Sequence, residues 1–326
     1  MIALYLGRGA VSYHSDTQGA LAAYTRVTEL DPSHMEGHNR RGHLLHRLGD
    51  LPAAQDAYEK VLSLADTQND PSGKAAALGN LGNLAQVRGD LDAAEGFYTQ
   101  SLEMNKKLGS KEGTANQYGN LGIVARVRGN LDAAEGFHTQ ALGLHTELGR
   151  KEGMAIQYGS LGIVAQKRGD SDAAEGFLTQ ALGLHTELGH KEGMAANHGN
   201  LGIVAMIRGD LDAAEGFYNQ ALELNKILGR KEGMASDYGN LGLVAQARGD
   251  LDAAEGFYNQ ALKLDKKLGR KEGMANQYSN LGGLEKARGN PKAARDHWIT
   301  ARDLYDAIGM PHMVEKTQGW LDDLGP

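Results

Sequence analysis

The sequence predicts an all-α repeat protein, an α-solenoid of stacked helical pairs. A Leu-Gly pair recurs every 40 residues, and a fixed period in this range is typical of solenoids, whose units bury their apolar faces only against neighbouring units. Each copy reads close to KEGMAxQYGNLGIVAxxRGDLDAAEGFYxQALxLxxxLGR, in which apolar and small residues follow helical spacing. The copies of the pair are Leu81-Gly82, Leu121-Gly122, Leu161-Gly162, Leu201-Gly202, Leu241-Gly242 and Leu281-Gly282.

The first helix of a unit is illustrated by the stretch that begins at Lys111. Ala115, Leu121 and Val124 fall on one helical stripe. Gly129 follows at the position where glycine takes the left-handed conformation that ends a helix without strain. The pattern therefore predicts that the first helix ends at Gly129 and at its copies.

The second helix begins directly after that glycine. Asn130 is a good N-cap residue, and Ala134 and Ala141 lie on the apolar stripe of a helix that continues to Leu148 and stops at Gly149. A short loop then leads into the next first helix. In other copies the N-cap residue is Asp90, Asp170, Asp210 or Asp250. Pro52 and Pro291 fall in the first turn of the same helix, where proline is tolerated.

We count eight helical pairs, which begin near residues 2, 35, 72, 112, 152, 192, 232 and 272. The segment Ile2 to Tyr13 lacks a Leu-Gly pair and is a degenerate first helix. Pro311 to Leu324 keeps the register as a lone helix, and we expect it to cap the array, because a terminal solenoid face needs a polar outer surface. We therefore expect three regions: residues 1–70 with degenerate and shorter units, residues 71–308 with near-identical units, and residues 309–326 as the C-terminal capping helix.

Composition and charge exclude several classes of function. The formal charge of −7 argues against nucleic-acid binding, which needs a basic face. The chain has no cysteine, which excludes disulfides and thiolate chemistry and fits a reducing compartment. No long apolar run could cross a membrane, and the first 14 residues do not resemble a signal peptide. We expect a cytoplasmic protein that contacts neither membrane nor nucleic acid and carries no cofactor.

The order of residues within a unit resembles the tetratricopeptide repeat. An aromatic residue lies three positions before Leu-Gly, and Gly-Asp or Gly-Asn, an Ala-Ala step and Phe-Tyr follow. The residues at the family's packing and turn positions are Tyr118, Leu121, Gly122, Gly129, Asn130, Ala134 and Ala141. The period is 40, whereas the usual period of this family is 34. The longer unit is similar to the long repeats of kinesin light chains and Leu-Gly-Asn-repeat adaptors. The resemblance implies a right-handed superhelix and a non-catalytic scaffold that binds proteins.

The resemblance also implies which side chains point into the concave face, which the first helices line in this family. The residue before Leu-Gly gives the row Asn80, Asn120, Ser160, Asn200, Asn240 and Asn280. The residue two after the leucine gives Asn83, Ile123, Ile163, Ile203, Leu243 and Gly283. The residue five after it gives Gln86, Arg126, Gln166, Met206, Gln246 and Lys286. We expect these rows to contact a partner.

Two interpretations of the asparagine row stay open at this point. A side-chain amide both donates and accepts, so the row could satisfy the backbone of an extended peptide without reading its sequence. The same amides could also bond to a neighbouring repeat and fix its angle. The inner glycines at Gly79, Gly119, Gly159, Gly199 and Gly239 have a similar pair of interpretations, close approach of a ligand or packing of a neighbouring helix, and we favour packing.

Three other sequence patterns give weaker evidence of function. The histidines of the second pair (His34, His38, His43 and His46) lack the convergent third ligand that a metal site needs, so we predict no metal site. In the Arg-Gly-Asp triplets, as at Arg88-Gly89-Asp90, the arginine and glycine end one helix and the aspartate is the N-cap of the next. The arginines Arg40, Arg41 and Arg47 could receive an acidic segment, although a solvated helix face is the simpler interpretation.

The predicted function is therefore a non-catalytic scaffold, a monomer or weak oligomer, that binds an extended peptide or a partner's helix in its concave groove. Two alternatives remain: the array could be the sensor of a larger signalling effector, or near-identical units could stack between molecules into a structural assembly. No nucleophile, base and orienting group recur together, so we do not expect an enzyme.

Overall fold

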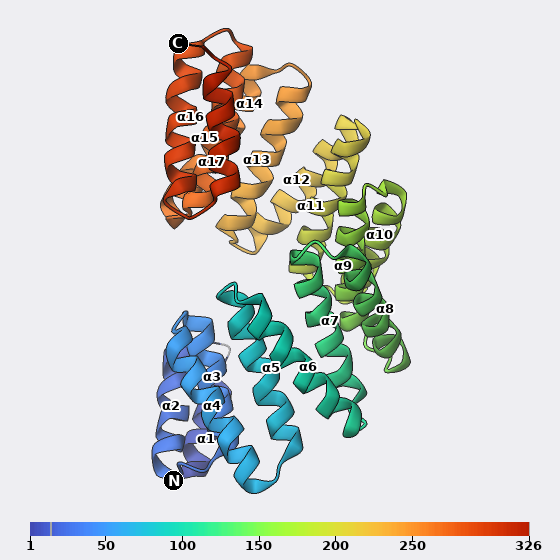
Figure 1. Cartoon of the computed structure of the whole chain (residues 1–326), viewed down its shortest axis with the longest axis vertical. Helices are drawn as coiled ribbons and strands as arrows, with labels where there is room; N and C mark the ends of the chain where they lie inside the picture. Colours follow the sequence, from blue (N-terminus) through green and yellow to red (C-terminus); the bar gives the residue numbers. More distant parts are fainter. Residues whose placement is uncertain (14, 326) are drawn as a thin grey trace. The chain divides into compact units, whose positions relative to one another are not determined.

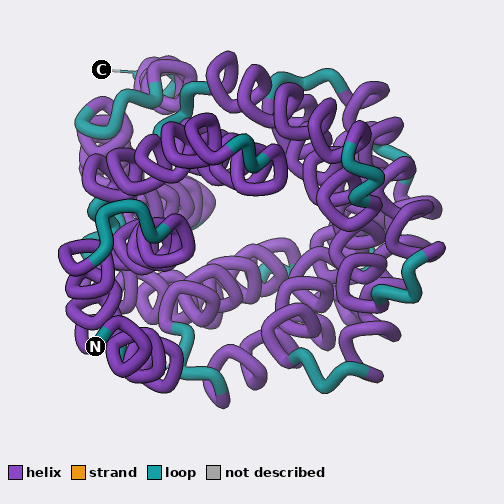
Figure 2. Tube along the Cα trace, turned by 90° about the horizontal axis from the view of Figure 1, so that it is seen from below, coloured by secondary structure: helices purple, strands orange, loops and turns teal. Residues whose placement is uncertain are grey.

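The computed structural model describes residues 1–13 and 15–325. In these residues the chain forms seventeen α-helices and no strand (Figures 1 and 2). The helices are α1 (Ile2–Ser12), α2 (Thr17–Leu30), α3 (Met35–Leu48), α4 (Leu51–Gln68), α5 (Pro71–Val87), α6 (Leu91–Lys107), α7 (Lys111–Val127), α8 (Leu131–Glu147), α9 (Lys151–Arg168), α10 (Ser171–Glu187), α11 (Lys191–Arg208), α12 (Leu211–Ile227), α13 (Lys231–Ala247), α14 (Leu251–Leu268), α15 (Lys271–Ala287), α16 (Pro291–Asp306) and α17 (Pro311–Asp322). The predicted all-α fold of eight helical pairs and a final lone helix is confirmed.

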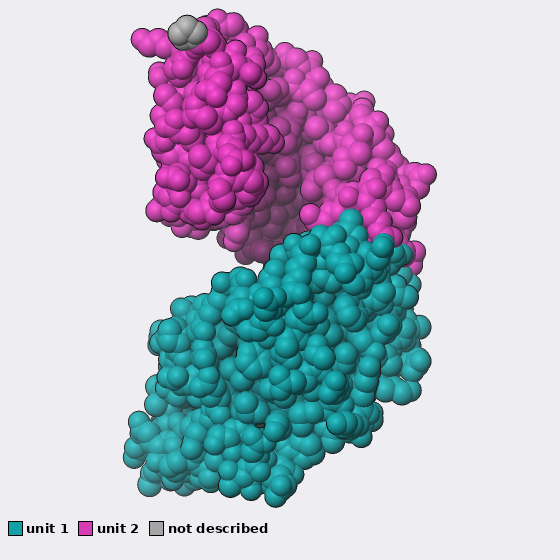
Figure 3. All heavy atoms as spheres, viewed as in Figure 1, with its two compact units in different colours: residues 1–160 teal, residues 161–326 magenta. Residues whose placement is uncertain are grey.

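The chain divides into two compact units, residues Met1–Ser160 and Leu161–Pro326, and the division falls inside α9 (Figure 3). Within each unit, helices that follow one another along the chain pack side by side, as α5, α6 and α7 do in the first unit. Successive first helices also contact each other, α3 with α5 in the first unit and α13 with α15 in the second. The first helices of a unit therefore present one continuous surface, which we call the first-helix face.

The turn between the two helices of a repeat follows the sequence prediction. Gly129 has φ 80° and Gly249 has φ 82°, the left-handed region that favours glycine. Directly after them, the side chains of Asn130 and Asp250 accept hydrogen bonds from the backbone N–H groups of Ala133 and Ala253 at 3.1 and 3.0 Å. Each repeat therefore ends one helix and starts the next within two residues.

The glycine of the Leu-Gly pair lets the two helices of a repeat approach closely. A Cβ atom on Gly82 would lie 2.5 Å from the ring of Tyr98, and one on Gly242 would lie 2.4 Å from the ring of Tyr258. Both tyrosines are completely buried, so neither ring has room to move aside. The same second-helix position holds His138, Leu178, Tyr218 and Trp298 in other repeats, each packed against its own Leu-Gly glycine.

Ion pairs connect successive repeats along one edge of each unit. Arg248, the arginine of an Arg-Gly-Asp triplet, pairs with Asp212 and Glu215 near the start of the preceding second helix. Arg128 pairs in the same way with Asp92 and Glu95 in the first unit. The arginine before the turn glycine therefore connects repeats, in Arg-Gly-Asp at Arg248 and in Arg-Gly-Asn at Arg128. Since the pairs are exposed, each contributes little to stability.

The lone helix α17 caps the last pair as the sequence predicts. Leu321 is buried with Ala294 and Trp298 of α16, and Trp320 packs beside them. The indole rings of Trp298 and Trp320 lie 5.6 Å apart, centre to centre. Asp322 and Asp323 are exposed at the end of this helix.

Candidate partner-binding face

The residues expected to contact a partner occupy equivalent places on the first-helix face, and all of them except the exposed Leu243 are half-buried. In the first unit these are Asn80, Asn83, Asn120, Ile123, Arg126 and Ser160. In the second unit they are Ile163, Gln166, Asn200, Ile203, Met206, Asn240, Leu243, Gln246 and Asn280. Leu243 is the most open of them, with 40% of its surface exposed. Each set is therefore accessible in part, as a contact surface requires, while its backbone is held in a rigid helix.

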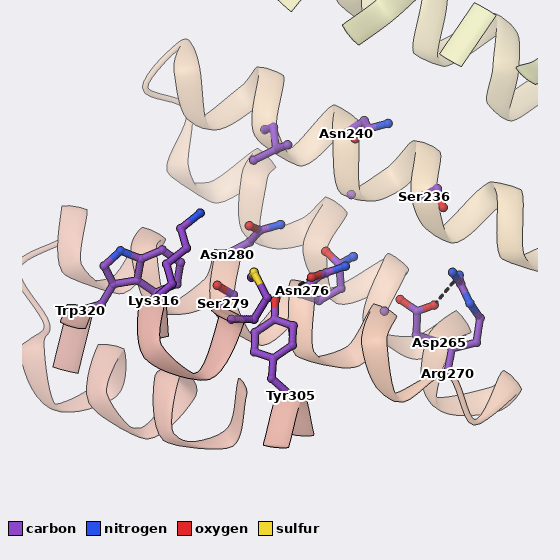
Figure 4. A pocket seen from close by; sticks show the side chains of 15 residues that line it. Ser236, Asn240, Asp265, Arg270, Asn276, Ser279, Asn280, Tyr305, Lys316 and Trp320 are labelled. Atoms are coloured by element: carbon purple, nitrogen blue, oxygen red, sulfur yellow. Dashed lines mark hydrogen bonds and ion pairs between the residues drawn. The ribbon is translucent and has the colours of Figure 1, made fainter. Parts of the chain in front are cut away.

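Part of the amide row is used inside the protein. Asn80 Nδ2 donates a hydrogen bond of 2.9 Å to Asn39 Oδ1 of the preceding first helix. At this end of the row, the interpretation as a bond between repeats holds. The structure gives no equivalent pair for Asn240 and Asn280, whose amides face a groove instead (Figure 4).

Three other predicted contact residues bond to the second helix of their own repeat. The Tyr98 hydroxyl lies 2.8 Å from Asn83 Oδ1 and 2.9 Å from Gln86 Oε1. The Tyr258 hydroxyl donates to Gln246 Oε1 at 2.7 Å. These amides orient a buried tyrosine, so a partner would meet them already partly satisfied.

The inner glycines are explained by the neighbouring first helix. A Cβ atom on Gly79 would lie 3.0 Å from Gln117 Nε2, and one on Gly119 would lie 3.1 Å from Gln157 Nε2. Both glutamine side chains are buried. Packing between repeats therefore accounts for these two glycines, as we favoured from the sequence. Gly199 differs, because a Cβ there would meet nothing within 4 Å.

A groove opens on the first-helix face of the second unit. It has a volume of about 360 Å³ and is bordered by α13, α15 and α17 (Figure 4). Asn240, Leu243 and Asn280 line it, and Lys316 and Trp320 lie together at one end. The sequence predicts a contact surface at Asn240, Leu243 and Asn280, but places Trp320 only within the capping helix. Its position 40 residues after Asn280, in the same row, was the signal that could have shown it.

A buried acid closes the other end of this groove. Asp265 is 1% exposed, and its Oδ1 accepts a hydrogen bond of 3.0 Å from Arg270 Nη1. Burial raises the pKa of the Asp265 carboxyl, and the Arg270 guanidinium opposes that shift. Arg270 also pairs with Glu232 of the preceding first helix. This end of the groove is therefore a satisfied internal network.

A second buried carboxyl, Asp237, replaces one of the buried side-chain amides that recur on the first helices. Asp237 stands where other repeats have Gln117 or Gln277, and it accepts a hydrogen bond of 2.7 Å from Asn225 Nδ2. Burial raises the pKa of Asp237 to about 6. The carboxyl is therefore close to its titration range at neutral pH.

The histidines and arginines of the second pair have structural roles. His34 caps α3 by accepting from Gly37 N, and His43 Nδ1 lies 3.1 Å from the Tyr58 hydroxyl. Arg47 donates to the backbone oxygen of Tyr13 and to the Thr17 hydroxyl. In residues 1–13 and 15–325, no three histidine, aspartate or glutamate side chains converge in a way that could hold a metal ion.

Comparison with known proteins identifies the repeat. The family model described as tetratricopeptide repeat matches residues 35–107, 113–187 and 193–267, more than half of the chain. The chain belongs to the tetratricopeptide repeat family. A fold of this family is generally a non-catalytic scaffold, and among the described residues no helix is long and apolar enough to cross a membrane.

One curated protein, the heat shock protein sti1 homolog of Schizosaccharomyces pombe, is 45% identical over 60 residues. That match spans 18% of this chain and only 10% of the length of the curated relative. The similarity is therefore confined to a short stretch of repeats.

Solved structures share the tetratricopeptide fold. A Rap protein complexed with competence and sporulation factor has a TM-score of 0.66 at 13% identity, with coverage of 99% of this chain and 97% of that one. A signal transduction ATPase with a tetratricopeptide repeat sensor from Pyrococcus horikoshii has a TM-score of 0.73 at 12% identity, with coverage of 96% and 49%. BtubC (BKLC) from P. vanneervenii has a TM-score of 0.58 at 24% identity, with coverage of 68% and 91%.

Proposed function

We propose that this tetratricopeptide array is a protein-interaction module that holds an extended segment of a partner protein against its first-helix face. The observation that carries the proposal is the groove of the second unit, which the amides of Asn240 and Asn280 line together with the exposed Leu243. An extended peptide presents backbone polar groups and side chains in alternation. The two amides could bond to its backbone, and the apolar Leu243 could contact one of its side chains.

The chemistry of capture would divide between backbone and side chains. Each asparagine can accept from one peptide N–H and donate to one peptide C=O, so the row binds backbone whatever the sequence of the partner. The side chains of Ile163, Ile203 and Leu243 would take apolar residues of that segment. Selectivity would therefore come from the row in which the repeats differ.

The test is the triple variant Asn120→Ala, Asn200→Ala and Asn240→Ala. A hydrogen bond of this kind has a net value of about 1 kcal/mol, so the loss of three should weaken partner binding by about 3 kcal/mol, on the order of a hundredfold in Kd. The matched control is the triple variant Asn116→Ala, Asn219→Ala and Asn259→Ala, which removes three exposed amides outside the row. If the row variant keeps its fold and binds its partner as tightly as the control, the proposal is wrong.

A second candidate function is that of a sensor within a larger signalling effector. The similarity to an ATPase with a tetratricopeptide repeat sensor favours it, because this chain aligns with about half of that protein. Under this proposal, the occupied first-helix face would change the activity of an effector that binds the array. An effector whose activity is the same with the wild-type array and with the asparagine-row variant would contradict the sensor role.

The oligomeric state is open to a direct check. We propose a monomer or weak oligomer, since the exposed Asp322 and Asp323 oppose stacking at the capped end. Light scattering over a concentration series should give the mass of one chain, or a mass that rises with concentration to a small multiple of it and then levels off. Mass that grows without limit would support a structural assembly.

A further inference from the structure

The row of inner side chains two residues after each Leu-Gly leucine, most of them apolar, loses its side chain at one place. Its members are Asn83, Ile123, Ile163, Ile203 and Leu243, and then Gly283. A Cβ atom on Gly283 would meet a single neighbour, Gln246 Nε2, at 3.9 Å. The side chain that fills this position in the preceding repeats is therefore replaced by open space.

That space opens onto a cavity of about 560 Å³ in the second unit, which Gly283 lines. Its walls include Leu243, Ala247, Gly283 and the two indoles, Trp298 and Trp320. A volume of this size lies in the range of roughly 300–1,000 Å³ that is typical of pockets for small ligands. The cavity joins the groove of Asn240 and Asn280, because Leu243, Asn280 and Trp320 line both.

The rim of the cavity is positively charged. Lys286 Nζ lies 5.8 Å from the centre of the Trp298 ring, and Lys316 Nζ lies 5.4 Å from that of Trp320. Both ammonium groups are exposed, Lys286 lines this cavity and Lys316 lines the adjoining groove. No carboxylate lines the cavity, although the whole chain has a formal charge of −7. The site therefore combines an aromatic wall with a local excess of positive charge.

We propose that this pocket, which we call the Gly283 pocket, binds one aromatic side chain of an acidic partner segment. The ring would fill the space over Gly283 beside the two packed indoles, where offset or edge-to-face aromatic pairs are favourable. Carboxylates before and after it would face Lys286 and Lys316, and the Asn280 amide would hold the backbone between them. The inference rests on the proposed peptide-binding function and adds the chemical class of the partner.

The tryptophans provide a local readout, because the chain contains only these two. The probe is a short peptide without tryptophan, in which one phenylalanine is flanked on each side by two aspartates. Its titration should change tryptophan emission in a saturable way. A peptide with serine in place of phenylalanine, or with lysines in place of the aspartates, should bind at least tenfold more weakly.

The decisive variant is Gly283→Leu, which restores the side chain of the preceding repeats and fills the pocket. It should weaken binding of the phenylalanine peptide at least tenfold. The matched control is Gly143→Leu, the same change at an exposed helical glycine of α8 with nothing within 4 Å. The double variant Lys286→Glu and Lys316→Glu should also lose at least tenfold and should lose the salt dependence of binding.

Each other outcome overturns the inference. Unsaturable emission with the wild-type chain, equal affinity of Gly283→Leu, or equal affinity for the serine and lysine peptides would each contradict it. If Gly283→Leu fails to fold, the peptide comparisons on the wild-type chain decide alone. Emission that depends on protein concentration without peptide would show that a second copy occupies the pocket. If these tests fail while the asparagine-row variant still loses its partner, only the Gly283 pocket is wrong, and the proposed function stands.

Discussion

The close approach of the two helices in each repeat predicts opposite effects for one substitution at two glycines of the same repeat. Gly242 of α13 faces the ring of Tyr258, whereas Gly256 of α14 is exposed and a Cβ there would meet nothing within 4 Å. Replacement of a helical glycine by alanine gains about 1 kcal/mol from helix propensity at either position. The two variants therefore differ only in what the added methyl group meets.

At Gly242 the new carbon would lie 2.4, 2.6 and 3.1 Å from three atoms of the Tyr258 ring. That ring is completely buried, so relief requires the two helices to move apart. Forcing an extra methyl group into a packed core costs about 1–3 kcal/mol. We expect Gly256→Ala to be stabilised by up to about 1 kcal/mol. We expect Gly242→Ala to be less stable than Gly256→Ala by about 1–3 kcal/mol, which is the steric cost alone.

The assay is urea unfolding of both variants and the wild-type chain, followed by far-ultraviolet circular dichroism. The slope of the transition shows whether both variants unfold with the same cooperativity, which the comparison of midpoints requires. If Gly242→Ala has a midpoint equal to or higher than that of Gly256→Ala, the explanation of the Leu-Gly pair as a close-packing device is wrong.

Two further predictions concern buried polar groups. Burial raises the pKa of Asp237 to about 6 from an ordinary value of 3.8, so its contribution to stability is full below pH 4 and is lost as the pH rises through 6. Asp237→Asn should therefore raise the free energy of unfolding at pH 7, by up to about 3 kcal/mol, and should flatten the change of the unfolding midpoint between pH 4 and 6. Tyr98→Phe removes a hydroxyl bonded to two amides and should lower the free energy of unfolding by about 1 kcal/mol. Tyr218→Phe, in a cluster with apolar neighbours, should lower it by less. Equal losses of stability in thermal unfolding would contradict this assignment.

Much of the fold could be predicted because local and repeated signals agree. The helix ends at Gly129 and the cap at Asn130 each follow from one residue type with one backbone role. The period of 40 then fixes every other copy. Only the terminal units depart from this pattern, and the 40-residue register predicts the capping helix that lies at residues 311–322.

The candidate site was predicted less completely, because side-chain partners depend on atoms from three helices. The sequence placed Asn83 and Gln86 on a contact surface, but could not show that the Tyr98 hydroxyl would reach both. Asn80, which bonds to the preceding repeat, differs from Asn240, which lines a groove. This difference has a signal in the sequence, because the residue 41 positions earlier is Asn39 for Asn80 but Gly199 for Asn240.

The central claim is that a partner lies on the first-helix face, and photo-crosslinking tests it directly. A benzoylphenylalanine residue is placed at Leu243, which is 40% exposed on this face, or at Ile227, which is 57% exposed on the second helix α12. We predict that the probe at Leu243 crosslinks to one segment of a partner, that the probe at Ile227 does not, and that the crosslink is lost in the asparagine-row variant. Crosslinking from Ile227 with none from Leu243 would contradict the account.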